Sequence, residues 1–350
     1  MKFNSTKMKK MRWITPLMLA GLYFLGSCGS SDTTINGNWI KTTPFGGETR
    51  SGAFEFTIGD KVFVGLGYGG LNGTQYLKDV QSYDLASGYW SPVAEFPGIG
   101  RELAVSFSVG GKGYVGTGYN RLQEAPAIVE LKDFWQYDPN SNTWTQLNDF
   151  PGEARYNALA FANDKNGFVG GGYNGNYYND FWKYTPENDS WQQIPSLIGD
   201  KREGAMSFTI SGIVYVFGGD NNASYEQDFY SLDLTTETPV WTNLTKITTD
   251  ANYNDFRAGV RRSNANAFTL GDMGYVVVGV AGSAPQTLVY QFNPITTTWT
   301  KMTAFEGGAR FQAISFVVGG RAFVGTGTNG TRKLDDIYEW RPDQSYNQAD

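Results

Sequence analysis

The stretch RSGAFEF, from Arg50 to Phe56, sets a pattern that returns five more times along the chain. An arginine is followed by alanine three positions later and by phenylalanine six positions later. The six arginines are Arg50, Arg101, Arg155, Arg202, Arg262 and Arg310. They are 47 to 60 residues apart, and self-similarity at such a period indicates a repeat architecture.

Three further markers keep the same period. A tryptophan lies 11 residues before five of the arginines and 21 before the other: Trp39, Trp90, Trp144, Trp191, Trp299 and, at the longer spacing, Trp241. An acid precedes an apolar-aromatic pair at Asp79, Asp133, Asp180, Asp228 and Asp336, with Thr287 in its place once. A glycine-rich segment such as VGGGYNG ends an apolar run in each unit.

Each unit fits four short strands joined by turns. In the second unit we expect them at residues 102–109, 112–119, 133–138 and 143–147. Glycine in the turns suits tight hairpins, which need positive φ. The last unit lacks its tryptophan strand, whereas one such strand, around Trp39, precedes the first unit. The sequence therefore predicts an all-β, six-bladed propeller with four-stranded blades, whose N-terminal strand completes the last blade.

These markers resemble the kelch-repeat family. The matching residues are the glycine pairs Gly171-Gly172 and Gly218-Gly219, the Tyr-Asp ends of third strands such as Tyr137-Asp138, and the spaced tryptophans. The resemblance covers residues 39–343 and implies a kelch-type propeller, the superfamily of the galactose oxidase central domain and of N-acetylneuraminate epimerase. Such propellers host many activities, so the fold alone does not give the function.

The first 27 residues have the character of a targeting segment. Five basic residues precede an apolar run, and Leu25-Gly26-Ser27-Cys28 resembles a bacterial lipobox, which implies lipidation of Cys28. An ordinary signal peptide is the alternative. We expect a signal peptide over 1–27, a flexible tether over 28–38 and the propeller over 39–343. Gly29 follows the cysteine, so no aspartate suggests retention at the inner membrane, and an outer-membrane lipoprotein of the cell envelope is expected.

Charge and composition narrow the possible partners and chemistry. Removing residues 1–27 takes the formal charge from −6 to −11 and leaves no basic block, which argues against nucleic acid as a partner. The chain has no histidine and one cysteine, which excludes histidine-based triads, most zinc and copper sites and an intrachain disulfide. The copper chemistry of galactose oxidase is therefore excluded, and we expect no cofactor or metal.

The repeated arginines allow two interpretations. All six begin the innermost strand, so we expect them to circle the mouth of the central channel. They could bind an anionic ligand, because a guanidinium grips a carboxylate through two bonds. They could instead fix the spacing of the blades, each paired with a neighbouring acid or with a backbone carbonyl. The candidate acids are Glu102, Glu153, Glu203 and Glu306.

Other candidate binding residues lie on the same face. Tyrosines follow the glycines of three successive units, at Tyr68, Tyr119 and Tyr173, and suit sugar rings or peptide side chains, or simply fill the propeller. An insertion before Arg262 could contact a partner through Asp250, Tyr253, Asp255, Phe256 and Arg257, although surface insertions also arise by drift.

The sequence favours a membrane-anchored, monomeric binding module that recognises an acidic glycan, an acidic peptide or an envelope protein. An enzyme resembling the bacterial sialic acid epimerases is the alternative. That chemistry needs only a carboxylate acid/base and a cation for the substrate carboxylate, and Glu102 or Glu203 could supply the carboxylate.

Overall fold

The computed structural model describes residues 36–70, 72–121, 128–244, 261–282 and 284–349. The described chain from Asn36 onward belongs to one compact unit, Ile35–Asp350. It contains strands and turns, and none of its described residues is helical. The candidate lipidation site Cys28 and the five candidate partner-loop residues (Asp250, Tyr253, Asp255, Phe256 and Arg257) lie outside the described residues.

Six antiparallel sheets of four strands dominate the described fold. We number them blades 1 to 6 by the order of their innermost strands. Blade 1 holds β3 (Phe54–Ile58), β4 (Lys61–Gly65), β7 (Val80–Asp84) and β8 (Tyr89–Pro92). Blade 2 holds β9 (Val105–Val109), β10 (Lys112–Gly116), β13 (Phe134–Asp138) and β14 (Thr143–Leu147). Blade 3 holds β15 (Leu159–Ala162), β16 (Gly167–Gly170), β17 (Phe181–Thr185) and β18 (Ser190–Ile194).

The other three sheets repeat the same order. Blade 4 holds β19 (Met206–Ile210), β20 (Ile213–Phe217), β23 (Phe229–Asp233) and β24 (Trp241–Asn243). Blade 5 holds β25 (Asn266–Leu270), β26 (Met273–Val277), β29 (Val289–Asn293) and β30 (Thr298–Lys301). Blade 6 holds β31 (Ile314–Val318), β32 (Arg321–Gly325), β33 (Ile337–Arg341) and β1 (Asn38–Lys41). The strands expected in the second unit match those of blade 2 closely.

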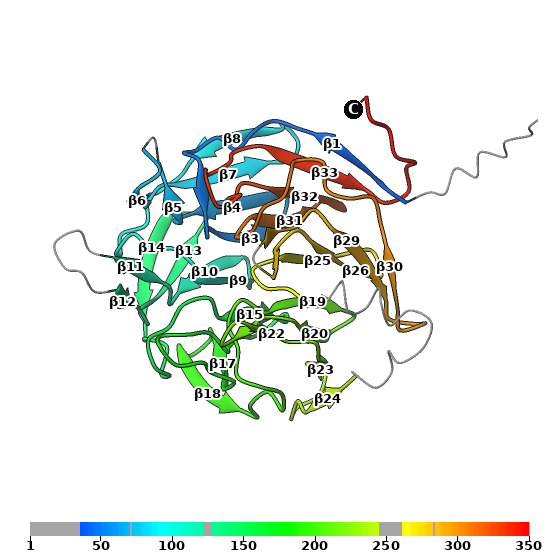
Figure 1. The fold of residues 1–350 in the computed structure, drawn as a ribbon. Helices are drawn as coiled ribbons and strands as arrows, with labels where there is room; N and C mark the ends of the chain where they lie inside the picture. The colour runs from blue at the N-terminus through cyan, green and yellow to red at the C-terminus, as the bar shows by residue number, and fades with distance from the viewer. Residues whose placement is uncertain (1–35, 71, 122–127, 245–260, 283, 350) are drawn as a thin grey trace, which may run out of the picture. The chain divides into compact units, whose positions relative to one another are not determined.

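The innermost strands form a closed ring. Each contacts the next in the order β3, β9, β15, β19, β25, β31 and again β3, and Figure 1 shows the sheets around this common centre. A cycle of backbone hydrogen bonds at 2.9–3.1 Å runs through the residues two positions after each arginine: Gly52, Leu103, Asn157, Gly204, Asn264 and Gln312. Each donates to the previous blade, and Gly52 donates to Gln312. The ring therefore closes after six blades, as the repeat count predicts.

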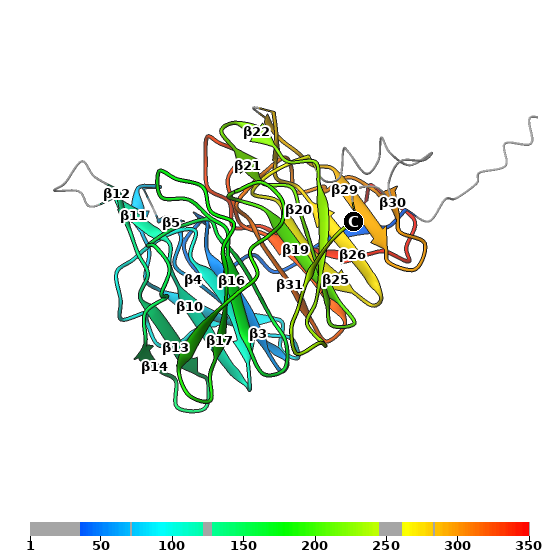
Figure 2. The ribbon, with the colours of Figure 1, turned by 90° about the horizontal axis from the view of Figure 1, so that it is seen from below.

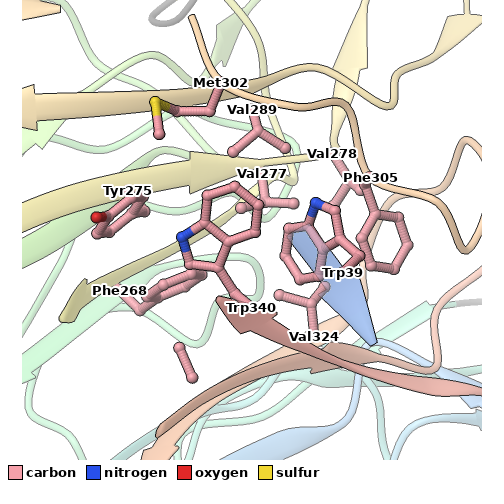
Figure 3. Packing of buried hydrophobic residues seen from close by; sticks show 11 residues of the cluster. Trp39, Phe268, Tyr275, Val277, Val278, Val289, Met302, Phe305, Val324 and Trp340 are labelled. Atoms are coloured by element: carbon pink, nitrogen blue, oxygen red, sulfur yellow. The ribbon is translucent and has the colours of Figure 1, made fainter. Parts of the chain in front are cut away.

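Blade 6 is completed by the N-terminal strand, as expected. β1 pairs with β33 in antiparallel register, with Trp39 opposite Trp340. Both indoles are fully buried, and the Trp39 ring lies 4.7 Å from Trp340 and 4.8 Å edge-on from Phe305 (Figure 3). Burial of these large rings across blades 5 and 6 joins the two ends of the chain.

Short hairpins extend the loops between the second and third strands of the blades. They are built from β5 (Tyr68–Gly69), β6 (Gln75–Tyr76), β11 (Tyr119–Arg121), β12 (Ile128–Glu130), β21 (Asp220–Asn221), β22 (Ser224–Tyr225), β27 (Val280–Ala281) and β28 (Ala284–Pro285). β2 (Arg50–Ser51), which precedes the first strand of blade 1, pairs with β5. Figure 2 shows β5, β11, β12, β21 and β22 along one side of the ring. The hairpins lie on the face where the innermost strands begin, since Ser51 pairs with Tyr68 and Glu102 pairs with Tyr119.

Candidate functional site

The six repeated arginines lie inside the blades. Each is at most 1% exposed. In blade 3, the Arg155 guanidinium donates to the Gly171 carbonyl at 3.0 Å and to both Asp180 oxygens at 2.5 and 3.1 Å. The same arginine also stacks on Phe150, 4.9 Å from the ring centre. The side chain thus ties the start of the first strand to the corner between the second and third strands of its own blade.

This arrangement repeats around the ring and corrects the sequence expectation. Five arginines pair with the aspartate that precedes the third strand: Asp79, Asp133, Asp180, Asp228 and Asp336. The nominated counter-charges Glu102, Glu153, Glu203 and Glu306 are not the carboxylates of these five ion pairs. Arg50, Arg101, Arg155, Arg202, Arg262 and Arg310 do not circle the channel mouth as expected, because their guanidinium groups turn into the blades. The structure favours the scaffolding interpretation.

Electrostatics agree with this assignment. Burial raises the pKa of Asp133, but the hydrogen bond and charge of Arg101 outweigh it and hold that pKa below its usual range. In blade 5, Thr287 replaces the aspartate, and Arg262 donates to the carbonyls of Val278 and Leu288. Burial lowers the pKa of Arg262 to about 10. The guanidinium groups are therefore structural cations, matched to partners inside their own blades.

The glycine signature has a related structural role. In blade 3, Gly172 adopts a φ of 93° and donates its N–H to the Arg202 carbonyl of blade 4 at 2.8 Å. A Cβ there would lie 2.8 Å from the Tyr156 carbonyl, so a side chain does not fit. The same N–H to next-blade arginine contact occurs in all six blades, which explains the repeated glycine.

The residue after each arginine differs between blades and faces the hairpins. We call the set Ser51, Glu102, Tyr156, Glu203, Ser263 and Phe311, together with the hairpin residues paired to them, the upper mouth. These six pair with the residue after the glycine signature: Tyr68, Tyr119, Tyr173, Asp220, Val280 and Thr328, respectively. Below the mouth, a cavity of about 160 Å³ runs along the axis, lined by the residues two and three positions after the arginines.

Two carboxyl groups of the upper mouth hold protons more tightly than usual. Glu102 is 6% exposed, and its carboxylate accepts a 2.6 Å hydrogen bond from the Tyr119 hydroxyl. Burial raises its pKa, and Tyr119 and the charge of Lys333 offset part of that rise. Burial also raises the pKa of Glu203, which accepts a 3.0 Å bond from the Asn157 amide. A carboxyl with a raised pKa is a candidate general acid or base.

One aromatic side chain links the two carboxyls. The Tyr156 ring lies 4.5 Å from the ring of Tyr119, the residue bonded to Glu102. Burial raises the pKa of the Tyr156 hydroxyl, and the charge of Glu203 adds to the rise. The sequence nominated Glu102 or Glu203 as the acid/base, and the structure places both at the upper mouth, in blades 2 and 4 on either side of blade 3.

The nominated tyrosines also lie on the upper mouth. Tyr68, Tyr119 and Tyr173 are half-buried there and belong to a continuous arc of six rings: Tyr68, Tyr76, Tyr119, Tyr156, Tyr173 and Tyr177. Neighbouring ring centres are 4.5 to 6.0 Å apart. The arc follows blades 1 to 3, whereas Val280 and Thr328 occupy the corresponding positions of blades 5 and 6. The continuous run of tyrosine contacts on the upper mouth therefore lies on blades 1 to 3.

Sequence reasoning missed a lysine, Lys333, whose charge acts on the Glu102 carboxyl. Lys333 pairs with Thr328 across the short hairpin of blade 6, and its ammonium lies 5.2 Å from the Tyr68 ring centre. Burial lowers the pKa of Lys333, while the charge of Glu102 partly restores it. Lys333 stands where blades 1 and 3 have Tyr76 and Tyr177. A lysine at a position that is otherwise tyrosine is the sequence signal that could have identified it.

Within the described part of the chain, no group of three or more Cys, Asp or Glu residues is arranged to hold a metal ion. That part also has no helix long and apolar enough to cross a membrane.

A protein-family model described as the KLHDC2/KLHL20/DRC7 Kelch-repeats domain matches residues 34–211 of this chain. The chain belongs to the kelch-repeat family. The structure titled "Structure of YjhT" aligns with a TM-score of 0.71 over 85% of this chain and 95% of that one. At 16% identity, this similarity supports the propeller fold alone.

Curated relatives carry one functional name. A Yersinia enterocolitica protein named N-acetylneuraminate epimerase is 39% identical over 101 residues, which are 27% of this chain and 24% of that protein. A Shigella flexneri protein of the same name is 30% identical over 144 residues, 41% of this chain and 37% of that protein. These matches overturn the binding module expected as the main function, since the relatives are named as epimerases, and favour the epimerase alternative.

Proposed function

We propose that this kelch propeller is an epimerase that interconverts the anomers of an acidic sugar of the N-acetylneuraminate type. The observation that carries the proposal is the pair of partly desolvated carboxyls, Glu102 bonded to Tyr119 and Glu203 bonded to Asn157, on the upper mouth of a chain whose curated relatives are named for that activity. The matches cover 24% and 37% of those relatives, so the epimerase activity is a proposal for this chain.

The chemistry needs two proton transfers and no cofactor. A base removes the proton of the anomeric hydroxyl, the bond from the anomeric carbon to the ring oxygen breaks, and an acid protonates that oxygen. The open-chain ketone then rotates, and the same groups reverse their roles as the ring closes on the other face. Glu203, half-buried beside Asn157, and Glu102, bonded to Tyr119, supply the two carboxyls.

A cation is also required, because the substrate carries its own carboxylate. The buried arginines are committed to their blades, so we assign this contact to Lys333, which sits between Tyr68 and Glu102. An ammonium in a partly desolvated position attracts an anion more strongly than one in bulk water. The carboxylate of the sugar would then lie on the blade 6 side of the upper mouth.

The cellular location and assembly remain proposals from the sequence. Lipidation of Cys28 would anchor the propeller at the surface of a membrane in the cell envelope, where it would act as a monomer.

Proton NMR of N-acetylneuraminate tests the proposed function. With the purified chain present, the exchange rate between the two anomers should rise well above the spontaneous rate. Glu203→Gln and Glu102→Gln should each lower the catalysed rate by about 10²–10⁴, the usual contribution of a general acid or base.

Glu153→Gln is the matched control, because Glu153 contacts Arg155 through its backbone carbonyl and not through its carboxylate. It should retain the catalysed rate. Exchange at the spontaneous rate in the folded parent chain would refute the proposal.

A further inference from the structure

A second cavity opens beside the upper mouth, between blades 3 and 4. Its volume is about 580 Å³. It is built by the hairpin loop of blade 3, the link into blade 4 and the β21–β22 hairpin, which contribute Asn176, Tyr177, Asn179, Lys201, Asn221 and Asn222. None of these residues was nominated from the sequence, and neither Glu102 nor Glu203 lines the cavity.

The tyrosine arc leads from the proposed catalytic carboxyls to this cavity. Tyr156 contacts Tyr173 with ring centres 5.7 Å apart, and Tyr173 contacts Tyr177 at 4.7 Å. Tyr177 is the last ring of the arc and also lines the cavity. Burial raises the pKa of the Tyr177 hydroxyl, and the charges of Asp220 and, to a smaller extent, Glu203 add to the rise, so both carboxyls act on this edge of the cavity.

The lining has the chemistry of a saccharide site. Four asparagine amides bring both donors and acceptors, which can serve the hydroxyls and acetamido group of a sugar. Lys201 adds an exposed cation beside the exposed carboxylate of Asp200, and Tyr177 adds an aromatic ring with a polar edge. A metal or nucleotide would need a different set of groups, such as clustered carboxylates or a glycine-rich phosphate loop.

We propose that this cavity, the blade 3–4 pocket, binds a second acidic sugar unit, so that the enzyme accepts oligosaccharides whose reducing end is an acidic sugar. This inference rests on the proposed function. The reducing unit, which has the free anomeric carbon, lies between Glu102 and Glu203. The next unit follows Tyr156 and Tyr173 into the pocket, where Lys201 meets its carboxylate.

The test compares two probes on the full chain: N-acetylneuraminate and a dimer of two N-acetylneuraminates joined by a glycosidic bond. Saturation-transfer NMR and titration calorimetry measure binding, and anomer exchange measures catalysis at the reducing unit. The parent chain should bind the dimer about tenfold more tightly than the monomer, the effect of one good additional contact.

Two variants target the pocket. Lys201→Ala removes the exposed cation, and Asn222→Gly removes an amide at a φ of 53°, which glycine tolerates. Each should lower dimer affinity about tenfold and leave exchange of the monomer within about twofold. Arg261→Ala is the matched control, since Arg261 holds the equivalent exposed position before the arginine of blade 5 and does not line the pocket.

The outcomes separate the two proposals. Catalysed exchange of the monomer with equal affinity for monomer and dimer would overturn the pocket and leave the epimerase standing. Dimer binding lost in both pocket variants but kept in Arg261→Ala would support the pocket even if no exchange were catalysed, in which case the epimerase fails. Dimer binding unaffected by both pocket variants would overturn the pocket whatever the catalytic result.

Discussion

Arg202 and Glu203 are neighbours in sequence and opposites in role. The arginine recurs in every blade, is 1% exposed and bonds to both oxygens of Asp228. The glutamate has a counterpart only in blade 2, is half-buried and faces the upper mouth. In this propeller, identity between blades marks the contacts that every blade needs in order to fold. Residues that differ between blades mark the surface where a ligand can bind. A single ligand lacks the sixfold symmetry of the ring, so it needs different side chains around it.

Substituting Arg202 and Glu203 in turn gives the largest expected difference in stability. Arg202→Ala removes a buried guanidinium, leaves the partly buried Asp228 without its ion-pair partner and should lower the free energy of unfolding by about 3–5 kcal/mol. Glu203→Gln should change that free energy by less than about 1 kcal/mol, because it removes no ion pair. Urea denaturation measures both. A stable Arg202→Ala protein that had lost only catalysis would reverse the comparison and restore the ligand-binding interpretation of the arginines.

Trp39→Ala tests closure of the ring, which depends on another repeated residue. The indole is fully buried against Trp340 and Phe305, so truncation should cost about 3–5 kcal/mol. Proteolysis near the N-terminal strand should also become faster, because β1 would open more often. Tyr89→Ala, which truncates a 69% exposed aromatic of blade 1, provides the control and should stay within about 0.5 kcal/mol of the parent.

Lys333→Gln tests a residue that differs from its counterparts in the other blades, as Glu203 does. Loss of the ammonium should raise KM for N-acetylneuraminate about tenfold and leave kcat nearly unchanged, the signature of lost uniform binding. Steady-state anomer exchange over a range of sugar concentrations measures both constants. Arg332→Gln removes the neighbouring exposed charge and should leave KM as it is. A fall in kcat at constant KM would instead mean that Lys333 acts only by tuning Glu102.

Glu55 is a smaller departure from the repeat, inside the channel. The other five blades have serine or alanine at its position: Ser106, Ala160, Ser207, Ala267 and Ser315. Glu55 lines both the 160 Å³ cavity and a cavity of about 700 Å³ at the opposite end of the channel. Burial raises its pKa from 4.5 to about 8, with the Ser315 backbone opposing the shift. The folded chain therefore binds this proton more tightly than the unfolded chain.

The sign of the resulting pH dependence follows directly. Stability linked to Glu55 is fully present below about pH 4.5 and is lost as pH rises through about 8. Glu55→Gln removes that loss, so its Tm should match the parent at acid pH and exceed it by a few degrees above pH 8. Thermal unfolding at several pH values measures this. Parallel Tm curves for parent and variant would mean that the channel hydrates the carboxylate.

The sequence was sufficient for the ring but not for the direction of its arginines. Strand order, blade number and the closing strand follow from marker residues that repeat once in each blade. The pairing of Arg101 with Asp133, 32 residues away, depends on how the side chain turns after folding. The acids beside the arginines were nominated as partners because sequence reasoning favours near neighbours, although the aspartates had been noted as a repeated marker.

The candidate site was predicted in part. Glu102, Glu203 and three of the tyrosines were found because they stand next to repeated residues. Lys333 and Tyr177 were not, since their place depends on cross-strand pairing within hairpins of different length. The blade 3–4 pocket could not be foreseen either, because its walls come from three loops that are separate in sequence.

Closure by β1 also sets an order of events during synthesis. The strand that contains Trp39 is the first of the propeller to leave the ribosome, yet its partner β33 begins only at Ile337. Until then the indole has no blade to enter, and β1 is an unpaired edge that can associate with other chains. The ring is thus completed in one late, long-range step, which makes the nascent chain most dependent on chaperone protection just before it ends.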